Sequence, residues 1–145
     1  MKKILMALSC LLIVITLTAC GEKTTETQEA QKSNEPLNLY GPWIQTNSNS
    51  ETSYQEAVIS EDGTITVNWI NEDEDTKSLY WAGSFKAPTT SDETYSWTST
   101  NDKEQTDSAL LASDAETKDF KYENGVISYE ASALGTTMTV ELERK

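Results

Sequence analysis

The side chains that could do chemistry are restricted in this chain. The sequence has no histidine, and both of its cysteines, Cys10 and Cys20, fall within the first twenty residues. Histidine is the usual general base and the commonest metal ligand, and disulfides and zinc–thiolate sites need cysteine. Ser–His and Cys–His catalysis are therefore excluded, and we expect neither a metal nor a cofactor.

Carboxylates are the chemical groups that remain, because the chain has 24 acidic residues. Two of them could act as in glycosidases, which need one raised and one normal pKa at a set separation, but no pattern selects a pair. The segment "NEDED", Asn71 to Asp75, lacks the EF-hand spacing of a calcium loop. We interpret this segment as a solvated loop. Because no pattern selects a carboxylate pair, a carboxylate-dependent hydrolase is the least favoured function, and we expect no enzyme.

Aromatic side chains form the other candidate site. Trp69, Trp81 and Trp97 lie in the body of the chain, and "SLYWAGSF" is the densest aromatic stretch. Strand alternation puts Tyr80 and Trp81 on opposite faces, and Gly83 inside the run indicates a bulge or the close approach of another chain or a ligand. The three tryptophans form a core, or one of them lines a barrel mouth and offers a stacking surface to a ligand.

The charge balance argues against nucleic acid as a partner. With 11 basic residues the formal net charge is -13, whereas nucleic-acid binding needs a basic face. The acidity is typical of a soluble, self-repelling surface.

The N-terminal segment has the organisation of an export signal. Lys2 and Lys3 precede a mostly apolar run from Ile4 to Leu17, which small residues follow. The run is shorter than the roughly 20 residues that a membrane-spanning helix needs. Residues 1–19 are therefore predicted to be a cleaved signal peptide.

The end of this segment, Leu17-Thr18-Ala19-Cys20, resembles the lipobox of bacterial lipoproteins. The resemblance implies cleavage between Ala19 and Cys20 and attachment of a diacylglyceryl group to the Cys20 sulfur. Radioactive palmitate would label such a lipid. Two acyl chains are needed for stable attachment, because one chain holds only marginally. The expected location is the outer face of the cell membrane, or the outer membrane in a Gram-negative source.

A polar linker separates this cysteine from the body. Residues 20–38 consist mainly of Thr, Glu, Gln, Lys and Asn, which cannot build a core. We interpret them as a flexible tether, and residues 39–145 as one β domain.

Period-two alternation of apolar and polar residues dominates that domain and predicts half-buried antiparallel strands. In "GTITVNWI", for example, Ile65, Val67 and Trp69 share one face. Eight strands are predicted, at Tyr40–Thr46, Tyr54–Ser60, Thr64–Ile70, Ser78–Lys86, Thr94–Thr100, Thr117–Glu123, Val126–Ser132 and Thr136–Glu143. Residues 108–113 are ambiguous between a helix and a further strand.

Turn residues connect these strands as hairpins. Glu61-Asp62-Gly63 and Glu123-Asn124-Gly125 tolerate positive φ, whereas "NEDED" and "APTTSDE" are predicted to be longer loops. Sequential hairpins favour an all-β fold, a single small antiparallel up-and-down barrel, with a β-sandwich as the alternative.

Gly41-Pro42-Trp43 resembles the Gly-x-Trp that opens lipocalin and other calycin barrels. That resemblance implies that Trp43 plugs one end of the barrel and that an arginine near the last strand packs over it. The only arginine of the chain, Arg144, follows the last predicted strand.

Three functions remain open at this point. The first is a lipid-anchored extracytoplasmic binding or interaction module of the bacterial envelope, similar in organisation to small Gram-positive lipoproteins. It could block an envelope process, such as phage superinfection or the action of an envelope enzyme. The second is a lipocalin-like carrier of a small apolar ligand, and the third is the hydrolase.

Overall fold

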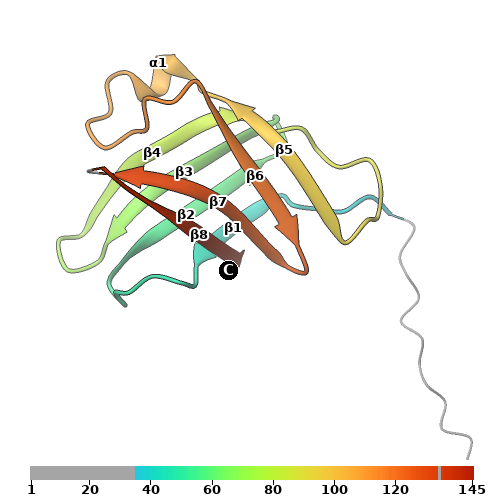
Figure 1. Cartoon of the computed structure of the whole chain (residues 1–145), viewed down its shortest axis with the longest axis horizontal. Coiled ribbons are helices and arrows are strands. Elements are labelled where there is room, and N and C mark those ends of the chain that lie inside the picture. Colours follow the sequence, from blue (N-terminus) through green and yellow to red (C-terminus); the bar gives the residue numbers. More distant parts are fainter. Residues whose placement is uncertain (1–34, 134) are drawn as a thin grey trace, which may run out of the picture. The chain divides into compact units, whose positions relative to one another are not determined.

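Eight antiparallel strands and one short helix make up the described part of the protein (Figure 1). The computed structural model describes residues 35–133 and 135–145. Its elements are β1 (Gly41–Gln45), β2 (Ser53–Ser60), β3 (Thr64–Asn71), β4 (Thr76–Ser84), β5 (Thr94–Thr100), α1 (Lys103–Thr106), β6 (Thr117–Glu123), β7 (Val126–Ala133) and β8 (Thr136–Arg144). The predicted signal peptide, the Ala19–Cys20 junction and most of the tether lie outside the described residues.

The strands form one curled sheet in the order β4-β3-β2-β1-β8-β7-β6-β5. Each pairing joins two strands that are consecutive in the sequence, except the pairing of β1 with β8, which joins the two halves of the sheet. This confirms the all-β, up-and-down prediction over the sandwich. The sheet closes only to a half-barrel, whose two edges are β4 and β5 (Figure 1).

The alternation and the turns position these strands largely as predicted. On β2 and β3, the inward pairs Ala57–Val67 and Ile59–Ile65 face each other in register and are fully buried. Asn124 and Gly125 take positive φ of 51° and 93° in the β6–β7 hairpin, the conformation that the tightest hairpin turns require. The turn at "NEDED" is shorter than predicted, because β3 continues through Asn71. The Asn71 side-chain oxygen accepts hydrogen bonds from the backbone amides of Asp73 and Glu74 in the turn.

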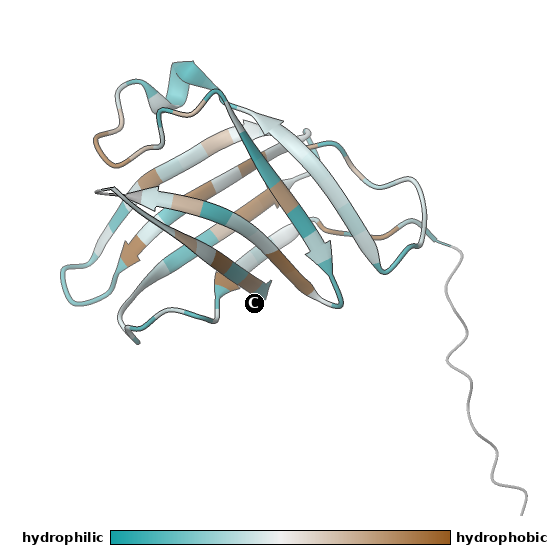
Figure 2. Ribbon diagram, viewed as in Figure 1, coloured by the Kyte–Doolittle hydropathy of each residue, from teal (hydrophilic) through white to brown (hydrophobic). Residues whose placement is uncertain are grey.

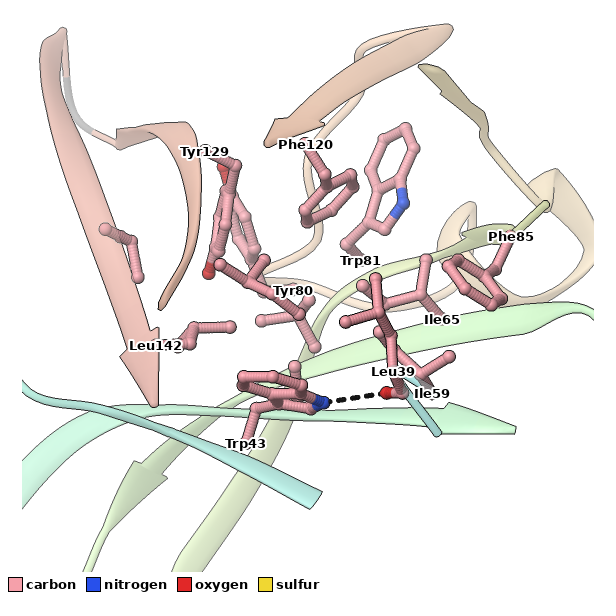
Figure 3. Close-up of a cluster of buried hydrophobic side chains, with 14 of the residues drawn as sticks. Leu39, Trp43, Ile59, Ile65, Tyr80, Trp81, Phe85, Phe120, Tyr129 and Leu142 are labelled. Atoms are coloured by element: carbon pink, nitrogen blue, oxygen red, sulfur yellow. Dashed lines mark hydrogen bonds between the residues drawn. The ribbon is translucent and has the colours of Figure 1, made fainter. Parts of the chain in front are cut away.

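Side chains from both halves of the sheet fill the interior (Figure 3). Tyr80, Phe120 and Tyr129 point toward one another in this view, and Trp43 lies farther off beside Leu39. Trp43 is 1% exposed, and its indole Nε1 donates a 2.9 Å hydrogen bond to the Leu39 carbonyl. The core therefore links the segment before β1 to the sheet.

Arg144 covers Trp43 from the last strand. Its guanidinium lies 4.7 Å from the centre of the Trp43 ring, and it donates hydrogen bonds of 2.6 and 2.7 Å to the carbonyls of Tyr40 and Asn38. A Cβ on Gly41 would lie 3.3 Å from Arg144 Nη1, so a glycine suits this position. The expected packing of arginine over tryptophan is present, whereas kinship with calycins stays a prediction.

A bulge in β4 changes which residues face the interior. The pairing with β3 shifts between Val67, opposite Trp81, and Asn68, opposite Leu79, so Tyr80 is the extra residue. The prediction that Tyr80 and Trp81 lie on opposite faces is wrong, because the extra residue inverts the alternation and both side chains are buried.

The two sheet edges meet at one end. Gly83 of β4 forms an isolated bridge with Asn101, just after β5, and the Asp102 amide donates a 2.8 Å hydrogen bond to the Ala82 carbonyl. Gly83 thus lies where a second segment of the same chain comes close to β4. Lys32–Lys145 is a compact unit by itself, and residues 35–145 carry all the described strands and their core, so they meet the description of an independently folding domain.

Candidate ligand-binding site

A cavity of about 680 Å³ lies among β3, β4, β6, β7 and the segment after α1. This volume lies within the range of small-molecule sites. We call it the Trp69 cavity, and its lining residues are Trp69, Tyr80, Leu110, Leu111, Ala112, Ser113, Asp114, Ala115, Lys118 and Ser132.

Two aromatic rings form one wall of the Trp69 cavity. Trp69 is half-buried near the end of β3, and its ring meets Tyr80 edge to face with centroids 5.5 Å apart. Tyr80 reaches the interior because of the β4 bulge. The wall therefore presents a fixed apolar surface, suited to an aliphatic or aromatic group.

Residues 110–115 form another wall of the cavity and are held in place by polar contacts. The Asn101 side chain donates hydrogen bonds to the carbonyls of Ser113 (3.3 Å) and Ala115 (2.7 Å), and the Ser113 amide donates one of 2.8 Å to the Tyr80 carbonyl. The ambiguous residues 108–113 are neither helix nor strand, because these contacts anchor them across the barrel end.

The same segment exposes apolar side chains at the cavity. Leu110 is 97% exposed and Leu111 is 52% exposed, and Figure 2 shows hydrophobic residues in the loop after α1, which is otherwise mostly polar. Exposed leucines beside an aromatic-walled cavity are typical of a surface that receives an apolar group.

Lys118 brings a buried cation to this cavity. It is 9% exposed, and its Nζ donates hydrogen bonds to the Tyr80 hydroxyl (3.1 Å) and the Glu130 carbonyl (2.9 Å). The Nζ also lies 5.0, 5.3 and 5.7 Å from the ring centres of Tyr80, Trp81 and Tyr129. Within the described residues, the ion pairs of 4 Å or less do not include Lys118.

The position of Lys118 follows from a local separation of β6 and β7. Their pairing extends from the hairpin only as far as Phe120 opposite Tyr129. Beyond that point, Lys118 binds the Glu130 carbonyl, and the Tyr80 hydroxyl accepts a 3.2 Å hydrogen bond from the Ser132 amide. Two side chains thus replace ladder hydrogen bonds that buried backbone groups require.

A second polar contact lies deeper in the core. The Tyr129 hydroxyl donates a hydrogen bond to Gln55 Oε1. Burial, with a smaller contribution from Tyr80, raises the pKa of Tyr129 well above its usual value. Tyr129 therefore stays protonated as a donor, while Gln55 Nε2 has no hydrogen-bond partner in the described structure.

The three candidate tryptophans have different surroundings. Trp69 lines the cavity, whereas Trp81 is fully buried and donates a 3.0 Å hydrogen bond to Ser99. Trp97 is 6% exposed and stacks on Phe120 with centroids 5.1 Å apart. It borders a separate cavity of about 500 Å³, whose other lining residues are largely polar. The structure thus brings only Trp69 to the apolar cavity.

The sequence interpretation missed Lys118, although a signal was present. In "TKDFKYE", Lys118 has the same parity as the inward residues Phe120 and Tyr122. A charged residue in the apolar phase of a strand indicates either an edge position or a buried charge. The exposure of Leu110 had no comparable signal, because it depends on the conformation of an irregular segment.

The acidic turn shows hydrogen bonding within the protein. The Tyr54 hydroxyl donates a 2.7 Å hydrogen bond to Glu72, and this bond, together with burial and nearby carboxylates, raises the pKa of Tyr54. Within the described ranges, no group of three or more Asp, Glu, His or Cys side chains is arranged to hold a metal ion. No helix in that part of the chain is long and apolar enough to cross a bilayer.

Comparison of the chain with family models, with curated proteins and with solved structures gives no match.

Proposed function

We propose that this protein is a lipid-anchored, extracytoplasmic binding module that holds a small ligand with a substantial apolar part. The observation that carries this proposal is the Trp69 cavity of about 680 Å³, with its aromatic wall and the exposed Leu110 and Leu111. The proposal joins two functions that the sequence left separate, the anchored binding module and the carrier of an apolar ligand.

The binding part can be tested on a fragment of residues 35–145 with N-phenyl-1-naphthylamine, an uncharged fluorescent probe. We expect saturable enhancement of its emission, and we expect Trp69→Ala to weaken binding because it removes half of the aromatic wall. Ile70→Ala is the matched control, since adjacent strand residues point to opposite faces. Absence of saturable binding, or equal binding by wild type and Trp69→Ala, would refute this function.

The anchoring part rests on Leu17-Thr18-Ala19-Cys20. We expect Cys20→Ala to abolish incorporation of radioactive palmitate in producing cells and to move the protein out of the membrane fraction. Cys10→Ala, a change within the predicted signal peptide, is the control. Label that persists in Cys20→Ala would overturn the anchor.

Interaction with an envelope protein is the second candidate function. The exposed Leu110 and Leu111 favour it, because they could contact a protein as well as a ligand. A photo-crosslinking residue at position 110 should then capture one specific envelope protein in intact cells, and a residue at position 62, in the β2–β3 turn, should not. Capture at background level from both positions would count against this function.

A further inference from the structure

Lys118 is buried, and none of the ion pairs within the described residues includes it. The proposed function does not explain this charge. We propose that the Trp69 cavity selects amphipathic monoanions, a carboxylate joined to an apolar chain, and that Lys118 binds the carboxylate. This inference rests on the proposed function, since it names the ligand class of the same cavity.

The hydrogen bonding of Lys118 leaves room for such a ligand. A lysine ammonium has three N–H donors, and within the described structure Nζ makes two hydrogen bonds, to the Tyr80 hydroxyl and the Glu130 carbonyl. Lys118 also lines the Trp69 cavity. The third N–H is therefore available to an acceptor in the cavity.

The electrostatics favour an anion over a neutral acceptor. A buried charge is costly unless it is paired, and here the partners of the ammonium are neutral oxygens and three aromatic rings. Cation–π contacts offset only part of that cost. A ligand carboxylate would supply the missing opposite charge in a partly desolvated site.

The other charged groups around Lys118 limit the ligand to one negative charge. Asp114 lies on the wall of the same cavity, and Asp119 and Glu130 border a neighbouring groove that Lys118 also lines. Burial raises the pKa of Tyr129 well above its usual value, so this neighbouring phenol carries no charge at physiological pH. Lys118 is the only cation among the residues that line the cavity, so a phosphate dianion is disfavoured.

The remainder of the cavity specifies the apolar part. A carboxylate at Lys118 would place its attached chain along Tyr80 and Trp69 and toward Leu110 and Leu111. These surfaces offer no charged group to the chain. A straight aliphatic carboxylate such as decanoate therefore represents the proposed ligand class.

Isothermal titration of the 35–145 fragment with decanoate, decanol and decyl phosphate tests the assignment. We expect decanoate to bind at least about tenfold more tightly than decanol, because hydrogen bonds to charged groups contribute that much. Lys118→Met should remove this advantage, so that decanoate and decanol bind to the variant with similar affinity, because methionine keeps the apolar length of the side chain but not its charge. Lys121→Met, on an exposed residue of the same strand, is the control and should behave as wild type.

Each outcome separates the inference from the function on which it rests. Equal binding of decanoate and decanol by wild type would overturn the role of Lys118 and leave the binding function standing. Tighter binding of decyl phosphate would overturn the carboxylate assignment. Binding of none of the three would refute both proposals. If circular dichroism shows that Lys118→Met is unfolded, the comparison of decanoate with decanol on the wild type decides the question by itself.

Discussion

Gly83→Ala should destabilise the protein because β4 and the end of β5 meet at this residue. A Cβ at position 83 would lie 2.5 Å from both Ser99 Oγ and the Thr100 carbonyl oxygen, and 2.8 Å from Trp81 Nε1. One of these neighbours is backbone and the other two share a buried hydrogen bond of 3.0 Å. None of the three can move without disturbing the seam between the two sheet edges.

The size of the effect follows from these contacts. Relief of the overlap needs a shift of roughly 1 Å, since carbon contacts are optimal at about 3.5 to 4 Å. Overpacking of this kind costs about 1–3 kcal/mol, and loss of the Trp81–Ser99 hydrogen bond adds about 1 kcal/mol. We expect a loss of about 2–4 kcal/mol in the free energy of unfolding. In an open strand the same change would stabilise by about 0.5–1 kcal/mol, so the sign of the effect is diagnostic.

Urea unfolding of the 35–145 fragment, followed by tryptophan emission and by circular dichroism, measures this loss. Gly125→Ala is the comparison, because a Cβ there has nothing within 4 Å and only its φ of +93° opposes the change. Its cost should be limited to about 1–2 kcal/mol. A Gly83→Ala variant as stable as wild type, or more stable, would refute the close contact between β4 and β5.

Three further perturbations test other parts of the fold. Arg144→Lys should lower the free energy of unfolding by about 1–2 kcal/mol, because lysine cannot reproduce the forked hydrogen bonds to Tyr40 and Asn38; unchanged stability in urea would contradict this role. Wild-type stability should decrease as the pH rises above about 10, since Tyr129 then ionises only in the unfolded chain; Tyr129→Phe should show a shallower decrease, and an identical pH profile would argue against a buried phenol. Burial of Glu56 opposes its ionisation, but hydrogen bonds from Lys77 and Lys145 outweigh burial and lower its pKa. Glu56 therefore stabilises the folded state above pH 4.5, its ordinary pKa in the unfolded chain, and this stabilisation is lost in more acidic solution. Thermal melts of Glu56→Gln should show a smaller loss of stability in acid than wild type, and an equal loss would count against these ion pairs.

Most of the fold could be predicted because its determinants are local. Alternation along β2 and β3 places Ala57, Ile59, Ile65 and Val67 inward, and each short turn fixes which strands become neighbours. The β4 bulge could not be predicted in the same way. Its single extra residue depends on how β4 aligns with β3, and no local pattern around Tyr80 and Trp81 records that alignment.

The candidate site could be predicted only in part. Trp69 was one of three aromatic candidates, and burial separates it from Trp81 and Trp97. Whether a strand tryptophan lines a cavity depends on what lies against it, and here that is the segment of residues 110–115, held by Asn101. The Asn101 side chain thus contacts residues 12 and 14 positions further along the chain. Such contacts form only in the tertiary structure, and local sequence patterns do not indicate them.

The sequence by itself determined the class of fold, the pairing of consecutive strands within each half of the sheet and the exclusion of histidine and thiol chemistry from the body, whereas the opening of the sheet between β4 and β5 is a tertiary property. These properties follow from the residue types and from the alternation of apolar and polar residues with a period of two. Both are features of the sequence itself and do not depend on tertiary contacts. The tertiary structure alone decided that Lys118 is buried among aromatic rings and that Leu110 stays exposed beside them. Burial is a property of the space between strands distant in sequence, so the cavity, its cation and its apolar rim exist only once β4, β6 and β7 are assembled.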